Sequence, residues 1–247
     1  MLVYNYDEIT KEYLGSQEAD CDYGETKVQG HFVPLVPANA TLTAPPEEQT
    51  NKARVYNGEW SYIDDYRTNY KKADSSLNIF DISNLGPIEE GFYLVTNAMA
   101  EGIESNRSYY KILNGEVVRK SNEEIAAEEL AKAKALKIRE NDTVRDATIN
   151  GGVMYKDILF DSDTDQKVNL LAMAPAMSET DVITWYGMNN EGLECTRDDL
   201  ELIGALIATL HTYCWTRNAQ LKGEINAAET VEEVEAIEIT YDINGEE

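Results

Sequence analysis

Three aspartates alternate in the stretch FDSDTDQKVNLLA, at Asp161, Asp163 and Asp165. Alternating carboxylates resemble the ligands of an EF-hand calcium loop, which also needs glycine at its sixth position and glutamate at its twelfth. Counted from Asp161, those positions hold Gln166 and Ala172, so the bend and the bidentate ligand are both missing. Asp163 with Gln166 instead forms a capping-box pattern, and Asp165 then lies in the first turn, where the helix dipole favours a carboxylate. The stretch therefore predicts the start of a helix and no metal site.

Histidine and cysteine form no recognisable catalytic pattern. The two histidines are His31, beside a proline-rich stretch, and His211, one step off the apolar stripe of a predicted helix. Neither has the spacing of a zinc site or a nucleophile in a known motif nearby. Cys214 lies one turn from His211 but on the stripe itself, where a small apolar residue packs well. We interpret His211 as a structural residue of the helix flank and expect no cysteine–histidine catalysis.

The remaining reactive groups also predict no catalysis. Cys21, Cys195 and Cys214 cannot all pair within the chain and are predicted to be free thiols made in a reducing compartment. Carboxylates are so numerous that pairs at acid–base spacing carry no information, and no motif supports a glycosidase. The glycines at 151–152 are not followed by the Lys-Ser/Thr of a phosphate loop. We therefore predict a protein that is not an enzyme and uses no cofactor.

The composition of the chain limits the classes of partner that we expect. The 247 residues are 43% hydrophobic and hold 46 Asp and Glu against 21 Lys and Arg, a net charge of −25. This charge repels phosphate backbones and anionic membranes, so nucleic acid is not an expected partner. No basic leader or long apolar run is present, so we expect neither a signal peptide nor membrane insertion. The aromatic residues are mostly tyrosine, 15 against 4 Phe and 3 Trp, which is typical of half-buried sheet faces and contact surfaces.

The first half of the chain predicts β structure. Residues 1–50 are expected to form two short strands and a proline-rich extension, which is either a linker or a segment laid across another surface. Residues 51–119 are expected to form a β-hairpin module, because the Asn-Gly pairs at 57–58 and 114–115 are type I′ turn signals between alternating apolar residues. The stretch GPIEEGFYLVTNAMAEG between them predicts loop and short strand.

A helix is expected at residues 120–146, where Ser121 and Glu124 form a capping box. The segment is rich in strong helix formers. Its apolar stripe is thin, with alanines between Ile125, Leu130 and Ile138. Two interpretations stay open: a solvated connector, or a helix that binds a partner or a second copy. The spacing holds no heptad, so no coiled coil is expected.

Residues 147–247 are expected to form a C-terminal domain of hairpins and helices. After the helix from Asp163, the stretch DVITWYGMNNEGLECT predicts two strands, with Trp185 on the first. Thr196 and Asp199 cap a long helix, whose stripe is broken only near Asn218. That stripe holds Leu200, Ile203, Ile207, Leu210, Cys214, Leu221, Ile225 and Ala228.

The last segment adds two smaller elements. Thr230 and Glu233 cap a short helix, and the alternating tail AIEITYDINGEE is expected to add a strand. The predicted fold class is therefore α+β. It comprises a β-hairpin-rich N-terminal half, a connecting helix, and a small strand-plus-helix C-terminal domain.

One hairpin resembles a known family. The stretch ARVYNGEWSYIDDYR resembles the tail-fibre assembly proteins of tailed bacteriophages, in which an A-x-V-x-x-G-x-W hairpin precedes an acidic residue and an arginine. The matching residues are Ala53, Val55, Gly58, Trp60, Asp65 and Arg67. Where those proteins usually have His-Arg-Gly, this chain has Tyr-Arg-Thr at 66–68. The stretches LGPIEEGFYLVTN and YYKILNGEVVRKS resemble a second hairpin module common in the same proteins.

The stretch from Ala147 to about Ile239 resembles an uncharacterised C-terminal domain found on phage tail-fibre and fibre-associated proteins. The segments INGGVMY, FDSDTDQKVNLLA, ITWYGMNNEGLECT and LKGEINAAETVEEVEAI carry this resemblance. Trp185 and Asn190 match its usual strand-and-turn pattern. The resemblance implies a phage virion or assembly context and supplies no reaction.

These resemblances lead to a functional expectation. We expect a non-enzymatic, tail-fibre-associated protein that binds other fibre proteins, as a structural component of the virion tail or as a chaperone during assembly in the host cytoplasm. A homo-oligomer is compatible with this expectation. The alternatives are a distal receptor-binding tail protein and a polysaccharide hydrolase. Trp60, Tyr62 and Trp185 are the candidate partner-binding residues, and the competing interpretation places all three in ordinary core packing.

Overall fold

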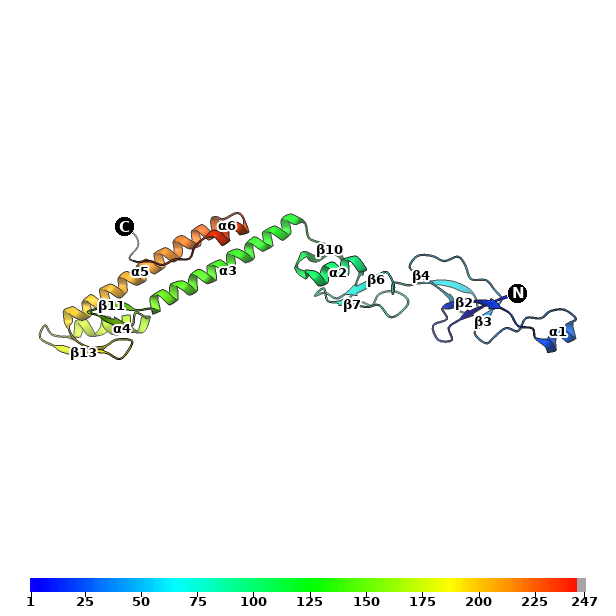
Figure 1. Ribbon diagram of the computed structural model, residues 1–247, viewed down its shortest axis with the longest axis horizontal. Coiled ribbons are helices and arrows are strands. Elements are labelled where there is room, and N and C mark those ends of the chain that lie inside the picture. The colour runs from blue at the N-terminus through cyan, green and yellow to red at the C-terminus, as the bar shows by residue number, and fades with distance from the viewer. Residues whose placement is uncertain (244–247) are drawn as a thin grey trace. The chain divides into compact units, whose positions relative to one another are not determined.

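Strands and helices separate along the chain in the computed structural model, which describes residues 1–243 (Figure 1). The chain divides into two units, Met1–Ser121 and Asn122–Glu247. The first unit is rich in short strands and the second in long helices, so the predicted α+β class is confirmed. Because the division falls at Ser121, the helix expected at 120–146 belongs to the second unit and is not a separate connector.

The first unit begins with a three-stranded antiparallel sheet in the order β2-β1-β3. Its strands are β1 (Leu2–Tyr6), β2 (Tyr13–Glu18) and β3 (Ala40–Thr41). The predicted turn between β1 and β2 is present, where the Asp7 carboxylate accepts the backbone N–H groups of Ile9 and Thr10. The proline-rich stretch contributes β3, which pairs with β1.

A short helix, α1 (Tyr23–Gln29), was not predicted. The Asp22 carboxylate caps its first turn by accepting the Glu25 N–H at 3.0 Å. Gly30 ends it in the left-handed region, at φ 73°, a conformation that glycine adopts without strain. Local capping thus forms the helix without any periodic apolar pattern.

The hairpin of β4 (Lys52–Tyr56) and β5 (Trp60–Asp64) follows. Tyr56 pairs with Trp60, so the loop holds three residues, and only Gly58 among them has positive φ. A type I′ turn requires positive φ at both central residues of a two-residue loop, so that prediction was wrong for this hairpin. It is confirmed at the second Asn-Gly pair, Asn114 and Gly115, with φ 53° and 83°.

The rest of the first unit surrounds a small core. Strands β6 (Tyr70–Ala73), β7 (Ile79–Phe80) and β8 (Tyr93–Thr96) form a sheet in the order β7-β6-β8. Helix α2 (Asn97–Ser105), a single turn η1 (Arg107–Tyr109) and the hairpin of β9 (Tyr110–Leu113) and β10 (Glu116–Arg119) complete it. Helix α2 replaces predicted loop, because Thr96 caps it and its apolar face is buried. The buried residues are Ala73, Leu77, Val95, Ala100, Ile103 and Val117.

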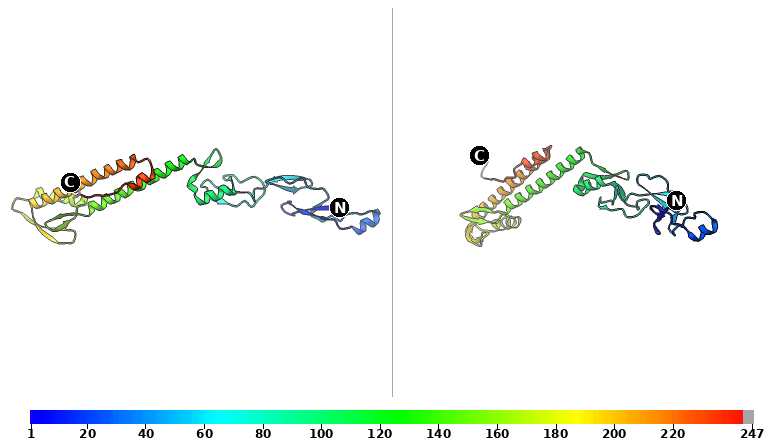
Figure 2. Two further views of the ribbon diagram at one scale, coloured as in Figure 1. Left: turned by 45° about the horizontal axis from the view of Figure 1, so that its top comes forward. Right: turned by 45° about the vertical axis from the view of Figure 1, so that its right-hand side comes forward.

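The second unit is built on two long antiparallel helices, α3 (Asn122–Asn150) and α5 (Arg197–Ala227), which lie side by side (Figures 1 and 2). The Lys134 ammonium donates a hydrogen bond to the Asn226 carbonyl, and the Asn141 amide donates one to the Asn218 carbonyl. These two contacts fix the antiparallel register of the helices. Helix α3 is therefore a packed element of this unit. It continues to Asn150, beyond the expected end at residue 146.

In the sequence, two hairpins and a helix lie between α3 and α5. The hairpins are β11 (Val153–Tyr155) with β12 (Ile158–Phe160) and β13 (Val182–Tyr186) with β14 (Gly192–Thr196). Helix α4 (Thr164–Met173), followed by the turn η2 (Ala174–Ala176), starts at Asp163, whose carboxylate accepts the Gln166 N–H at 2.7 Å. The prediction of a helix start at the three aspartates is therefore confirmed.

Helix α5 supplies the core of the second unit. Its predicted capping box is present, with Thr196 and Asp199 each accepting the other's backbone N–H. All stripe residues from Leu200 to Ile225 are buried, at 5% exposure or less, while Ala228 caps the helix end. Phe160, Leu170, Met177 and Cys195 pack against the first turns.

The C-terminal segment folds back after α5. Helix α6 (Val231–Ala236) begins at the predicted cap, where the Thr230 hydroxyl accepts the Glu233 N–H. The strand expected in the tail was wrong for residues 237–243, which form no strand pairing; the rest of that prediction lies outside the described residues. Tyr213 and Arg217 donate instead to backbone carbonyls of the tail.

Candidate functional site

The side chains considered for catalysis are His211 and the buried cysteines of the second unit, and each has a packing or hydrogen-bonding role. Within residues 1–243, no three His, Cys, Asp or Glu side chains are placed to hold a metal ion. The ring of His211 makes a 2.6 Å hydrogen bond, through Nε2, with the backbone carbonyl of Ser162. Burial raises the pKa of the Cys195 and Cys214 thiols, which opposes thiolate formation. No described helix meets the length and hydropathy of a membrane span.

Aromatic side chains gather on the first unit instead. Neighbouring strands place their rings in one ladder, which we call the aromatic ladder: Tyr4, Tyr6, Tyr13, Tyr56 and Trp60. Trp60 lies 5.1 Å from Tyr56 and 5.7 Å from Tyr13, between ring centroids. The Tyr6 and Tyr56 rings lie 5.1 Å apart, tilted by 33°. All five residues are half-buried, which is the arrangement of a sheet face with amphipathic rings.

Two of the predicted partner-binding residues, Trp60 and Tyr62, lie together on β5. The Trp60 indole N–H donates to the Thr43 carbonyl at 2.8 Å, and the Tyr62 hydroxyl donates to the Glu47 carbonyl at 2.5 Å. Of the two interpretations of the proline-rich stretch, the segment laid across a surface is the one found here. The polar atoms of Trp60 and Tyr62 are therefore used within the chain, and their role as partner anchors stays a prediction.

The acidic residue and arginine of the hairpin motif form an ion pair. The Arg67 guanidinium donates to both oxygens of Asp65, at 2.9 and 2.8 Å, and also to Glu12. The hydrogen bonds that the Arg67 side chain donates to Asp65 are the main cause that lowers the pKa of the Asp65 carboxyl. Since Glu12 also pairs through its backbone with Val55, the motif's charged residues join the hairpin to the first sheet.

The third predicted residue, Trp185, is half-buried in the second unit. It lies on β13 opposite Leu193 and packs against the core that includes Leu200 and Ile203. Its neighbour Tyr186 points the other way and is 61% exposed. The structure thus gives Trp185 a packing role, and it brings Trp60 and Tyr62 together on a different unit.

Several large apolar side chains are exposed on residues 20–36, here called the α1 loop. Two backbone hydrogen bonds close it, from Asp22 N to Val33 O at 2.9 Å and from Leu35 N to Asp20 O at 2.7 Å. Helix α1 within it has no buried residue, and Tyr23 and Val28 are 83% and 82% exposed. Large apolar side chains exposed on one short loop make it a candidate interaction surface. The sequence analysis did not predict this loop, although Asp22 as a helix N-cap and Gly30 as a helix C-cap were signals for α1.

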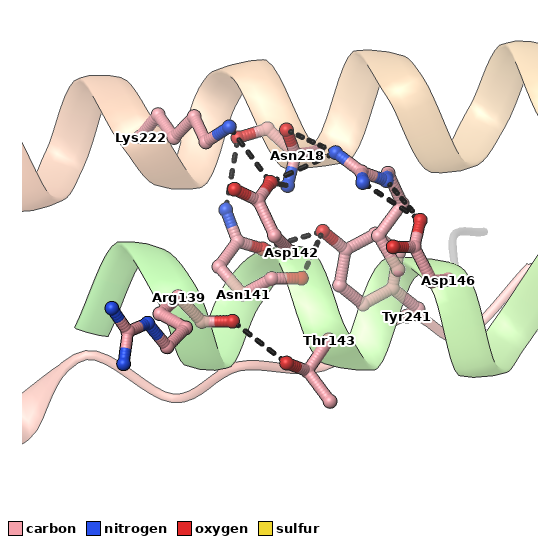
Figure 3. Close-up of polar contacts among 9 residues, drawn as sticks. Arg139, Asn141, Asp142, Thr143, Asp146, Asn218, Lys222 and Tyr241 are labelled. Carbon is pink, nitrogen blue, oxygen red and sulfur yellow. Dashed lines mark hydrogen bonds and ion pairs between the residues drawn. The ribbon is translucent and has the colours of Figure 1, made fainter. Parts of the chain in front are cut away.

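The second unit contains a polar cluster between its long helices (Figure 3). We define the interhelical polar cluster as Asn141, Asp142, Arg145, Asn218 and Tyr241. Asn141 is fully buried, donates to the Asn218 carbonyl at 3.1 Å and accepts from the Tyr241 hydroxyl. Arg145 donates to Asp142 at 2.8 Å. The Asn141 contacts join α3 to α5 and to the tail, whereas the Arg145–Asp142 contact lies within α3.

This cluster holds α3, α5 and the C-terminal tail in one register. Lys222 reaches the Asp142 carboxylate at 2.7 Å, and the Asn218 amide donates to the same carboxylate at 3.0 Å. The Arg145 guanidinium also lies 4.1 Å from the centre of the Trp215 ring, a cation–π contact. The break in the apolar stripe at Asn218 was the one sign of the cluster in the sequence.

Comparison with known proteins gives one match. Residues 132–241 match the family described as Domain of unknown function (DUF4376). No curated protein and no solved structure matches the chain. The matched residues run from α3 through α6 to the tail tyrosine of the interhelical polar cluster. Over these residues, which form most of the second unit, the chain is similar to a domain whose description assigns no activity.

Proposed function

We propose that this protein is a non-enzymatic, tail-fibre-associated protein of a tailed bacteriophage that binds other fibre subunits. It acts as a structural component of the virion tail or as a chaperone of fibre assembly in the host cytoplasm. The support comes from the resemblance of residues 53–67 to tail-fibre assembly proteins and from the surface chemistry of the first unit. Binding by surface complementarity requires no reactive centre.

The observation that carries this proposal is the α1 loop. Tyr23 and Val28 are large apolar residues on a capped helix that buries none of its own residues. Phe32 and Leu35, both 48% exposed, lie on the same loop. Exposing this area to water is unfavourable, at about 25 cal/mol per Å², and a partner that covers it recovers that free energy.

Co-purification with fibre subunits tests the proposal. The full chain is co-expressed with candidate fibre proteins as wild type, as Tyr23→Ser/Val28→Ser, and as the control Ile9→Ser. Ile9 is 89% exposed in the same unit but lies in the β1–β2 turn. We expect a fibre protein to co-purify with the wild type and with the control, and to be lost with the double variant.

The outcomes separate the alternatives. Mass spectrometry of purified virions distinguishes a retained component from a transient chaperone. Wild-type protein that binds host cells and no fibre protein would replace the proposal with a receptor-binding role. Release of reducing ends from a host glycan would replace it with hydrolysis.

A further inference from the structure

A groove of about 770 Å³ runs between α3 and α6 in the second unit. The two helices lie side by side in both views of Figure 2. On the α3 side the lining residues recur every three or four positions, from Ala126 to Glu140, and so lie along one helix face. At 1.5 Å per residue this face is about 20 Å long, which matches roughly four turns of a second helix.

The floor of the groove is apolar. Leu130, Ala133 and Leu136 of α3 face Val231 and Val234 of α6. Val234 is buried at 1% exposure and closes the base, whereas Leu136 is 55% exposed. A shallow apolar floor of this length is the shape that the apolar stripe of an amphipathic helix fills.

The rim of the groove is acidic. The charged residues that line it are Glu129, Lys132, Lys137 and Glu140 of α3, and Glu229, Glu232 and Glu235 around α6. Lys137 lies 3.3 Å from Glu140, so its charge is already balanced. Within residues 1–243, Glu232 and Glu235 have no ion-pair partner, and no Lys, Arg or His follows Lys222 in the sequence.

This charge pattern selects the occupant. A helix with Lys or Arg beside its apolar stripe would place its cations over the glutamates of α6, and complementary charge speeds association and fixes orientation. A second copy of the chain would bring the same acidic α6 and a net charge of −25, which opposes self-association. We propose that the α3–α6 groove binds a basic amphipathic helix of a partner protein.

The proposal goes beyond the tail-fibre assignment, because it names the chemistry of the occupant and not its source. The groove lies in the second unit, whereas the α1 loop lies in the first. Failure of one binding surface therefore leaves the other standing.

Binding of synthetic helices to the full chain tests the groove. The probe is a fluorescent Leu/Lys amphipathic peptide of about 18 residues, measured by anisotropy. Two matched peptides serve as controls, one with Glu in place of Lys, and one with the same composition shuffled to destroy the stripe. The first control tests the charge of the occupant and the second tests its apolar face.

Four variants locate the binding site. Glu232→Lys/Glu235→Lys changes the rim, and Glu179→Lys/Glu191→Lys makes the same charge change on exposed glutamates elsewhere in the unit. Leu136→Asn changes the floor, and Leu202→Asn is its control, since Leu202 is 53% exposed on α5. Circular dichroism confirms that each variant is folded.

We expect the Leu/Lys peptide to bind with an affinity that falls as salt rises. The rim variant and the floor variant should each weaken binding about tenfold or more, while their controls change it by less than about threefold. Equal binding of the shuffled or glutamate peptide would overturn the proposal. So would equal losses with the rim variant and its control, or a dimer in light scattering that the rim variant dissociates.

Discussion

The substitution Arg145→Met tests the interhelical polar cluster. The Arg145 side chain is only 10% exposed, and its guanidinium donates to Asp142 at 2.8 Å and to Asp146 at 2.9 and 2.7 Å. Methionine keeps an unbranched stem beside the Trp215 ring but removes every donor. The substitution therefore isolates the charge and its hydrogen bonds from the packing of the side chain.

The expected cost follows from burial on each side of the pair. Removing one partner of a fully buried ion pair costs about 3–5 kcal/mol, because the remaining charge is left uncompensated. The side chains of Asp142 and Asp146 are 35% and 58% exposed, so water solvates them again once the guanidinium is absent. We therefore expect a loss of about 2–3 kcal/mol in the free energy of unfolding, which lowers the melting temperature by roughly 10 °C for a unit of this size.

Urea unfolding followed at 222 nm measures this loss, because α3 and α5 dominate the helical signal. The matched control is Arg197→Met, which removes a surface ion pair to Glu201 whose partners are 42% and 51% exposed. That pair should contribute less than about 0.5 kcal/mol. If the two variants unfold at the same urea concentration, the cluster contributes no more than a surface ion pair and the reasoning is refuted.

Three further predictions concern the Asp199 carboxyl, a pair of glycines and the three thiols. Hydrogen bonds from Lys156 and, as the second cause, from Tyr155 hold the pKa of the Asp199 carboxyl well below its usual range. The stabilisation from these bonds is fully present above about pH 5. It is lost as pH falls toward the pKa of Asp199 in the folded protein. Asp199→Asn should therefore lose about 1–2 kcal/mol at pH 7 and unfold with a flatter acid dependence in pH-dependent urea titrations. Gly152→Ala should destabilise by more than about 1 kcal/mol, since φ is +86° and a Cβ would lie 2.6 Å from the Phe160 carbonyl. Gly204→Ala, with nothing within 4 Å, should stabilise α5 by about 0.5–1 kcal/mol in thermal melts, and the opposite ranking would contradict this account. Ellman's reagent should modify Cys21 alone in the folded chain, because the other two thiols are fully buried; fast reaction of two or three thiols would show that the second unit opens.

Local signals in the sequence predicted the helices of the second unit well. The caps at Asp163, Thr196 and Thr230 all form, because a capping carboxylate or hydroxyl acts on N–H groups within three residues. The apolar stripe of α5 is buried as its spacing indicated, since only one helix face can enter a core.

Other elements depended on information that local patterns lack. Helix α1 has no buried residue, so no periodic spacing of apolar residues in the sequence predicted it. The first Asn-Gly pair lies in a three-residue loop because strand pairing sets Tyr56 against Trp60. Residues 237–243 do not form the expected strand, because these residues lie along α5 and are held by side chains such as Tyr213 and Arg217.

The sequence by itself determined the α+β class, the starts of α4, α5 and α6, the buried stripe of α5 and an acidic surface, since these follow from capping, periodicity and charge within short segments. Only the tertiary structure decided where α3 packs. Its apolar stripe is too thin to select a partner, and its register on α5 comes from Asn141 and Arg145 meeting Asn218, more than seventy residues away in the sequence. Likewise, the groove beside α6 exists only because α5 brings α6 back against α3, and no spacing along the chain records that contact.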